Sequence, residues 1–342
     1  MDGLGAVVLA AGRGTRMSSR RPKALHSLLG RPLALWPATL AAEVGARPIV
    51  MVIGPDQDDV ARTLAEHVGA PDLTFAVQAA PRGTADAVLA AREATRGWDH
   101  LLLLNADLPL LRAESLARLV QTYRERCADL LFASCKLSDG GQYGRVLRGA
   151  DSEVRAIREA RDASPEEMRV REVNVGAYLA RRSDLFQALS EVRNDNAQGE
   201  LYLTDIVAWM VARGRKVFAS TLDHPGEMQG VNNRVELASA ARVLCRRLLE
   251  QWMLAGVTFE DPRTTWIEPQ VELARDCVVG PGVMLRGATR LATGASVGPG
   301  AVLVDTVLGE EARVGANAVL HGALVPAGAQ VSPLTVRLES KG

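Results

Sequence analysis

Residues 9–23 read LAAGRGTRMSSRRPK and directly follow the apolar run 6–8. The run predicts a buried strand. Gly12 and Gly14 then predict a tight loop, because glycine lets a backbone bend sharply and lets a ligand approach it closely. Consecutive N–H groups in such a loop form a concave anion site, to which Arg16 and Lys23 add positive charge. The stretch therefore predicts a phosphate site at the carboxyl end of the first strand, where open α/β sheets bind ligands.

The loop matches neither of the two standard phosphate-binding motifs. No Lys-Ser or Lys-Thr pair follows Gly14, and Met17 stands where a dinucleotide-binding loop has its third glycine. A tight turn without a ligand is the alternative interpretation of a bare Gly-x-Gly. The lysine favours the phosphate site, because only four of the 40 basic residues are lysines and Lys23 is the only one before Lys136. A compact, mobile charge suits a phosphate whose geometry changes during transfer.

These residues resemble the nucleotidyltransferase signature LAAGxGTRMxSxxPKxLH, and the match continues through Ala24, Leu25 and His26. Further segments follow in the order of the bacterial N-acetylglucosamine-1-phosphate uridyltransferase family (GlmU). They are QAAPRGTADAV from Gln78, LLLLNADLPLL, YGRV, IREARDAS, REVNVGAY, NDNAQGELYLTDIV and GVNNR. The resemblance covers about residues 4–256. It implies a Rossmann-like nucleotidyltransferase domain.

Composition excludes several classes of protein. The 342 residues are 47% hydrophobic and carry no net charge, so two domains are expected and nucleic acid is not the main partner. No apolar run approaches the ~20 residues that span a bilayer, and the N-terminus does not read as a signal peptide. The four cysteines are scattered without a Cys-x-x-Cys pair, which indicates neither zinc nor a disulfide framework. We therefore expect a cytoplasmic protein without membrane contact.

The first two thirds of the chain alternate strand-like and helical segments. Apolar runs predict strands over 6–9, 48–53, 101–104 and 130–134, and amphipathic patterns predict helices over 58–67, 85–95 and 113–126. This alternation predicts an α/β fold with a mostly parallel sheet covered on both faces. A longer helical pattern over 232–255 would extend roughly 35 Å. We expect a nucleotidyltransferase domain over 1–230, a linker helix over 231–256 and a second domain over 257–342.

The last part of the chain has a six-residue period. Aliphatic residues recur every six positions and, after a one-residue deletion, resume the phase: Ile267, Leu273, Val279, Leu285, Leu291, Val297, Leu303, then Leu308, Val314 and Leu320. Such a period is typical of a parallel β-helix with the aliphatic side chains inside. An ordinary all-β domain with coincidental spacing is the alternative. The region resembles the left-handed hexapeptide β-helix of the same family, in shortened form.

The family's β-helix is long, carries acetyl transfer from acetyl-CoA and packs as a trimer. Here the repeats span about seventy residues, and no segment resembles the family's acetyl-transfer motifs. His321 is the only histidine of the repeats. It could serve as an acetyl-transfer base, but a solvated or packed side chain is the favoured interpretation. We expect no acetyltransferase activity, and the resemblance implies a homotrimer through the β-helix.

The resemblance implies attack of N-acetylglucosamine-1-phosphate on the α-phosphorus of UTP. Such a transfer depends on positioning and on neutralising charge. Arg16 and the amides of residues 12–15 are expected to hold the β- and γ-phosphates. Lys23 is expected to contact the α-phosphate and the incoming phosphate. Arg16 and Lys23 are therefore the candidate catalytic residues.

A magnesium ion suits this chemistry, because Mg²⁺ takes one or two protein oxygens together with phosphates. Asp107 follows a predicted buried strand and precedes Leu108-Pro109, which places its carboxylate at the sheet edge. Capping of the helix from residue 113, or a simple turn, is the alternative. The resemblance supplies Asn232 as the second metal ligand. The alternative for Asn232 is the N-cap of the linker helix.

Recognition of the base and the sugar is assigned from the resemblance. An amide such as Gln78 can donate and accept together, which matches a uracil edge. The expected nucleotide-binding residues are Leu9, Ala10, Ala11, Gly12, Gly14, Thr15, Gln78 and Gly83. The expected sugar-binding residues are Thr84, Gly144, Glu159 and Asn174. Outside these motifs, a polar strand end, a surface carboxylate and a turn asparagine would be the ordinary interpretations of Gln78, Glu159 and Asn174.

Two departures from the family pattern leave the substrate open. The family's Gly-Thr-Gly-His-Ala has Ala85 and Asp86 at its third and fourth positions, and its Tyr-Gly-Asp has Asn105 and Ala106 before Asp107. Another sugar-1-phosphate or nucleotide, such as glucose-1-phosphate or dTTP, is one alternative. A catalytically weak nucleotide-sugar-binding scaffold is another.

Overall fold

The computed structural model describes residues 3–12 and 14–338, which form two compact units. The first unit holds the described residues up to 26 together with residues 32–236. The second holds residues 27–31 and the described residues from 237 onward. The predicted linker helix is α8 (Arg234–Leu254), whose first three residues belong to the first unit.

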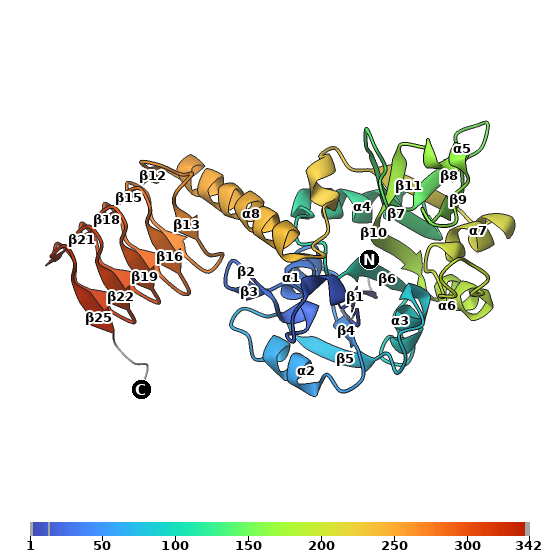
Figure 1. The fold of residues 1–342 in the computed structure, drawn as a ribbon, viewed down its shortest axis with the longest axis horizontal. Coiled ribbons are helices and arrows are strands. Elements are labelled where there is room, and N and C mark those ends of the chain that lie inside the picture. The colour runs from blue at the N-terminus through green and yellow to red at the C-terminus, as the bar shows by residue number, and fades with distance from the viewer. Residues whose placement is uncertain (1–2, 13, 339–342) are drawn as a thin grey trace. The chain divides into compact units, whose positions relative to one another are not determined.

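The first unit is built on one mixed sheet (Figure 1). Its strands are β1 (Leu4–Leu9), β4 (Ile49–Ile53), β5 (Leu73–Val77), β6 (His100–Asn105), β7 (Leu130–Lys136), β8 (Arg145–Arg148), β9 (Val154–Arg158), β10 (Glu172–Arg181) and β11 (Val217–Thr221). The main path runs β11-β7-β10-β6-β1-β4-β5, with β8 and β9 beside β10. Along this path only β10 is antiparallel to its neighbours. The prediction of a mostly parallel sheet is confirmed.

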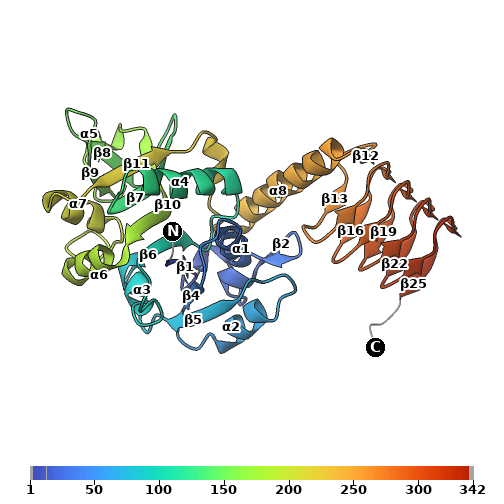
Figure 2. The same cartoon turned by 180° about the vertical axis from the view of Figure 1, so that it is seen from behind.

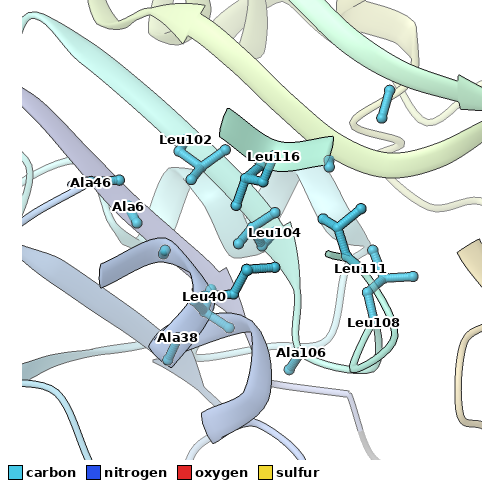
Figure 3. Close-up of a cluster of buried hydrophobic side chains, with 14 of the residues drawn as sticks. Ala6, Ala38, Leu40, Ala46, Leu102, Leu104, Ala106, Leu108, Leu111 and Leu116 are labelled. Atoms are coloured by element: carbon cyan, nitrogen blue, oxygen red, sulfur yellow. The ribbon is translucent and has the colours of Figure 1, made fainter. Parts of the chain in front are cut away.

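Helices cover both faces of this sheet. Helices α1 (Leu35–Glu43), α2 (Asp58–Ala65) and α4 (Ala113–Glu125) pack on one face. Helices α3 (Thr84–Ala90), α6 (Arg182–Glu191) and α7 (Asp205–Ala212) pack on the other. The side chains of each strand alternate between these two cores, so that Leu102 and Leu104 enter the first and Leu103 enters the second. Figure 3 shows Leu102 and Leu104 beside Leu116 of α4.

Shorter elements complete the chain before the repeats. They are β2 (Ser27–Leu28), β3 (Arg31–Pro32), α5 (Pro165–Met168) and three 3₁₀ turns, η1 (Thr15–Met17), η2 (Lys23–Leu25) and η3 (Pro225–Met228). Of the helices in residues 3–12 and 14–338, not one is both long and apolar enough to cross a membrane.

The repeats of the second unit form three parallel sheets, and Figures 1 and 2 show their stacked coils. The first sheet is β12 (Thr258–Phe259), β15 (Val278–Val279), β18 (Ser296–Val297), β21 (Arg313–Val314) and β24 (Gln330–Val331). The second is β13 (Trp266–Ile267), β16 (Met284–Arg286), β19 (Val302–Val304), β22 (Val319–His321) and β25 (Val336–Leu338). The third is β14 (Glu272–Leu273), β17 (Arg290–Leu291), β20 (Val307–Leu308) and β23 (Leu324–Val325). This series of strands is that of the predicted left-handed β-helix.

The six-residue period is confirmed by burial. All ten predicted aliphatic side chains lie inside the coils, with 6% exposure or less. Each residue pairs with its counterpart one coil away, as Leu285 does with Leu303 and Leu303 with Leu320. The predicted deletion lies between Leu303 and Leu308. A second shortening, between Leu320 and Val325, is not in the prediction, and the buried Val325 shows that the inward phase resumes after it.

Candidate functional site

A cavity of about 400 Å³ opens where β1 and β6 end in the first unit. The predicted site residues that line it are Leu9, Ala10, Ala11, Gly12, Lys23, Gln78, Gly83, Thr84 and Asp107. The other lining residues are Ala24, Leu33, Pro81, Ala87, Asn105, Ala106 and Glu200. The cavity therefore lies at the carboxyl ends of parallel strands, as the sequence predicts.

The glycine loop is shaped around Lys23. Gly14 has a φ of +59°, and a Cβ built on it would lie 2.5 Å from the Cβ of Lys23. Only glycine fits there, because a side chain would be strained by the backbone and would collide with the lysine. Arg13 lies outside the described residues. Met17, at the position of a third glycine in dinucleotide-binding loops, is buried instead and packs as part of the interior.

Lys23 joins the two predicted metal ligands. Its Nζ lies 2.6 Å from Oδ2 of Asp107 and 3.1 Å from Oδ1 of Asn232. Nη2 of Arg16 donates to the same Asn232 oxygen at 3.3 Å. The side chains of Lys23 and Asp107 are only 15% and 29% exposed, so solvent screens this pair less than an ordinary surface ion pair. Four predicted residues from distant parts of the sequence thus meet beside the cavity.

The capping alternatives for Asp107 and Asn232 do not hold, although Asp107 does lie in the turn that follows β6. The backbone N–H of Arg112 and the hydroxyl of Ser115, at the start of α4, both donate to the buried carboxylate of Glu227, at 3.0 Å. Glu227 therefore occupies the capping position that Asp107 was considered for.

The N-cap of α8 is Asn233, one residue after the predicted metal ligand. Its Oδ1 accepts from the backbone N–H of Glu236 at 2.9 Å, and the Glu236 carboxylate accepts from the backbone N–H of Asn232 at 2.6 Å. This reciprocal arrangement is close to a capping box. It leaves the side chain of Asn232 to Arg16 and Lys23. The preceding N–H, of Val231, donates to the backbone carbonyl of Asp107 at 2.9 Å.

The donor set at this point suits magnesium. Oδ2 of Asp107 and Oδ1 of Asn232 both accept from one ammonium group, so the two oxygens converge on the same small volume. A carboxylate and an amide oxygen are hard ligands of the kind that Mg²⁺ takes together with phosphate oxygens and water. The side chains present therefore fit the predicted ion.

Gln78 lies at the end of β5 and its amide nitrogen is fully engaged. Nε2 donates to Oδ2 of Asp86 at 2.9 Å and to the carbonyl of Gly83 at 3.1 Å. The expectation that Gln78 both donates and accepts toward a base is therefore narrowed to acceptance. Gly83 has a φ of +116°, and a Cβ on it would lie 2.4 Å from the carbonyl oxygen of Leu201. This close approach requires glycine.

The predicted sugar-binding residues gather around Gly144. Its carbonyl accepts from the backbone N–H of Asn174 at 2.8 Å, and a Cβ on Gly144 would lie 3.4 Å from the Glu159 carboxylate. Glu159 accepts from the Thr204 hydroxyl at 2.9 Å, and burial raises the pKa of its carboxyl. The neighbouring backbone N–H, of Leu203, donates to the hydroxyl of Thr84 at 2.9 Å. These contacts connect the predicted sugar-binding residues around Gly144 to the cavity, which Thr84 lines.

Three further residues reach the site without having been predicted as site residues. Glu200 and Asn105 line the cavity. Burial raises the pKa of Tyr143, and the Glu236 and Asp107 carboxylates act in the same direction, whereas a hydrogen bond from the Gly230 backbone opposes it. All three lie within motif segments quoted above, which is the signal that could have identified them.

Comparisons with known proteins identify the family of the chain. A family model of the MobA-like NTP transferase domain matches residues 6–209. "Bifunctional protein GlmU" of Syntrophotalea carbinolica is 42% identical over 325 residues, which cover 95% of this chain and 69% of the relative. This chain belongs to the GlmU family. The GlmU of Anaeromyxobacter sp. (strain Fw109-5) is 44% identical over 333 residues, covering 97% of this chain and 68% of that protein.

The fold of the first unit is shared beyond the GlmU family. The crystal structure of a UDP-glucose pyrophosphorylase complexed with UDP-glucose matches 71% of this chain and 99% of its own, with a TM-score of 0.58 and 17% sequence identity. At that identity the likeness establishes the fold. Membership of the GlmU family confirms the resemblance seen in the sequence, and the matched domain is that of a nucleotidyltransferase.

Proposed function

We propose that this GlmU-family chain transfers UMP from UTP to N-acetylglucosamine-1-phosphate, giving UDP-N-acetylglucosamine and pyrophosphate. The observation that carries the proposal is the meeting of Arg16, Lys23, Asp107 and Asn232 beside a cavity that residues 9–12 line. A binding scaffold has no need of two cations, a carboxylate and an amide oxygen at one point. Transfer of a nucleotidyl group between phosphates depends on such a cluster.

In the proposed reaction an oxygen of the sugar phosphate forms a bond to the α-phosphorus of UTP. The bond from that phosphorus to the oxygen bridging to the β-phosphate breaks, and pyrophosphate leaves. Arg16 and the loop amides hold the β- and γ-phosphates, and Lys23 neutralises the α-phosphate and the incoming phosphate. To do so the Lys23 ammonium must leave Asp107 and Asn232, which its flexible four-carbon stem allows.

Asp107 and Asn232 are the proposed holders of Mg²⁺. When bound, the ion supplies positive charge to the phosphate oxygens around the α-phosphorus. The Val231–Asp107 backbone hydrogen bond joins the two segments that carry these side chains. Their part in the reaction is to present two oxygens to the ion beside the carboxyl end of β6.

Different residues around the cavity select the base and the sugar. Gln78 and Gly83 with residues 9–12 face the base, and Thr84 faces the sugar together with the group around Gly144. A half-buried carboxylate such as Glu159 accepts from sugar hydroxyls.

Pyrophosphate release tests the proposal. The full chain is incubated with Mg²⁺, UTP or dTTP, and either N-acetylglucosamine-1-phosphate or glucose-1-phosphate. Release should be fastest with UTP and the N-acetylated sugar. Faster release with another pair would favour the second candidate, a nucleotidyltransferase for a different sugar or nucleotide, to which the Asn105-Ala106 departure on the cavity wall points. Absence of release with every pair would contradict the enzyme assignment.

The repeats are proposed to serve association, without acetyl transfer. Their one histidine, His321, is exposed at the end of β22. Val307 and Leu324 stand side by side on the outer face of the third sheet and are 38% and 67% exposed, a surface suited to packing against other copies in a trimer. Sedimentation should give a trimer, and glucosamine-1-phosphate should not cause consumption of acetyl-CoA. A monomer, or rapid consumption, would contradict the respective proposal.

A further inference from the structure

A chain of hydrogen bonds that begins at an exposed arginine and ends in the interior lies beside the cavity and is not used by the reaction proposed above. Arg82 donates to Oδ1 of Asp86 through Nη2 at 2.7 Å and through Nε at 3.2 Å. Oδ2 of Asp86 then accepts from Nε2 of Gln78 at 2.9 Å. Gln78 and Asp86 are 5% and 6% exposed, whereas the Arg82 side chain is 68% exposed. The chain therefore runs from solvent to the wall of the cavity.

The partners of Gln78 fix the direction of its amide. An ionised carboxylate has acceptor atoms only, and a backbone carbonyl likewise only accepts. The two groups facing the end of Gln78, Asp86 and the carbonyl of Gly83, are of these kinds. The NH₂ must point toward them, because the opposite orientation would place three oxygens together without a hydrogen. Both amide hydrogens are then used.

The oxygen of Gln78 is the group left for a ligand. Among the described residues no hydrogen bond is made to Oε1, and Gln78 lines the cavity. Arg82 matters here because it occupies the other oxygen of Asp86, which leaves Oδ2 for Gln78.

We infer that Asp86 is a positioning residue that holds Gln78 as a pure acceptor, so that the site selects a nucleobase with a ring N–H donor. This inference rests on the proposed function and adds the cause of its base preference. Uracil and thymine carry a hydrogen on N3. Cytosine has a lone pair on N3, which would face the Oε1 lone pairs and repel them.

The first experiment replaces Asp86→Asn, a change of nearly equal size. The new amide would offer its oxygen to Arg82 and its NH₂ to Gln78, so one of the two acceptors that hold the Gln78 NH₂ would be replaced by a donor, and only the Gly83 carbonyl would still favour the original orientation. Binding of UTP and of CTP to the full chain is measured by calorimetry, and kcat and KM are measured with each nucleotide. We expect the preference for UTP over CTP to fall roughly tenfold to a hundredfold. We also expect KM to change more than kcat.

Asp59→Asn is the matched control. Asp59 lies in the first turn of α2 and pairs with Arg62, as Asp86 lies in the first turn of α3 and pairs with Arg82. The Asp59 side chain is, however, 91% exposed and is not among the residues that line the cavity. The UTP preference of this control should equal that of the unchanged protein. A role of Asp86 in folding alone would weaken both nucleotides equally in Asp86→Asn and leave their ratio unchanged, which would overturn the inference.

A second measurement needs no variant and stays informative even where Asp86→Asn does not fold. N3-methyl-UTP lacks the proposed donor and carries a methyl group in its place. The unchanged protein should bind it at least about a hundredfold more weakly than UTP. Equal binding of the two would overturn the inference. Turnover of sugar phosphates with no preference for UTP over CTP would also overturn the inference, but it would support the transferase assignment. Selective binding of UTP without turnover would contradict the transferase assignment and not the inference.

Discussion

The cavity of the first unit and the coils of the second differ in how far apart in the sequence their contacting residues lie, and in whether the contacts repeat. In the coils each inward side chain meets its counterpart one turn away, as Leu285 meets Leu303. At the cavity Lys23 meets residues 84 and 209 positions away in the sequence. Successive coils repeat the same packing of inward side chains, whereas each functional side chain at the cavity occurs once. Changes in the cavity should therefore alter chemistry, and changes in the coils should alter stability.

The largest expected effect is that of Lys23→Ala. Loss of the ammonium leaves the developing phosphate charge and Asp107 without their cation, and removal of one such donor lowers kcat by about 10²- to 10³-fold. The rate of pyrophosphate release checks this. Lys216→Ala, at an exposed lysine, is the control and should retain full activity. Unchanged turnover in Lys23→Ala would remove the proposed role of this residue.

Leu303→Ala tests the other side of the comparison. The side chain is fully buried in the coils, so truncation should cost about 2–5 kcal/mol in the free energy of unfolding of the repeats. Circular dichroism during denaturant unfolding would measure it. Val302→Ala, at the half-buried neighbour on the outer face of β19, should cost much less. Pyrophosphate release should be unchanged in both variants below the transition, and a loss there would show that the two regions are not independent.

The neighbouring residues Asn232 and Asn233 allow an effect on activity to be distinguished from an effect on stability. Asn232→Ala removes the shared acceptor of Arg16 and Lys23, and activity should fall by about 10- to 100-fold with little change in stability. Asn233→Ala removes the N-cap of α8 and should cost about 1 kcal/mol. Activity assays and thermal unfolding of the two variants give the comparison. Loss of stability in Asn232→Ala together with loss of activity in Asn233→Ala would contradict the roles assigned to the two asparagines.

The smallest expected effect concerns pH. Burial raises the pKa of Glu159, so this carboxyl takes up its proton at a higher pH than an ordinary glutamate. A protonated Glu159 accepts less strongly from sugar hydroxyls, so KM for the sugar phosphate should rise as the pH falls, by roughly fivefold. The phosphate of the substrate also titrates, and Glu159→Gln corrects for it. A pH profile of KM that is the same in both proteins would contradict the sugar-binding role.

The elements that the sequence predicts are those with a simple pattern. β1, β4, β6 and β7 are apolar on both faces because helices cover both sides of the sheet, and such runs are easily recognised. β10 is missed because Glu172, Asn174 and Gly176 interrupt its apolar pattern. One of these interruptions belongs to the candidate site, since Asn174 is part of the group around Gly144, whereas Glu172 pairs with Arg148.

The candidate site was only partly accessible from the residues themselves. The glycine loop is a local signal, and spacing alone indicates it. The meeting of Lys23 with Asp107 and Asn232 depends on strand order, and the family resemblance rather than any spacing supplied it. The bond from Gln78 to Asp86 requires the chain to fold back at Gly83, a conformation with φ at +116° that no residue pattern in this segment announces.

The backbone bond between Val231 and Asp107 has a consequence for redesign. Main-chain atoms alone make it, so it does not depend directly on which side chains stand at positions 107 and 232. Proline at position 231 would remove its donor, and the side chain of Val231 is itself fully buried. Carboxylate, amide or imidazole groups can therefore be exchanged pairwise at positions 107 and 232 while this main-chain contact joins the two segments, and the ion affinities of the pairs can be compared.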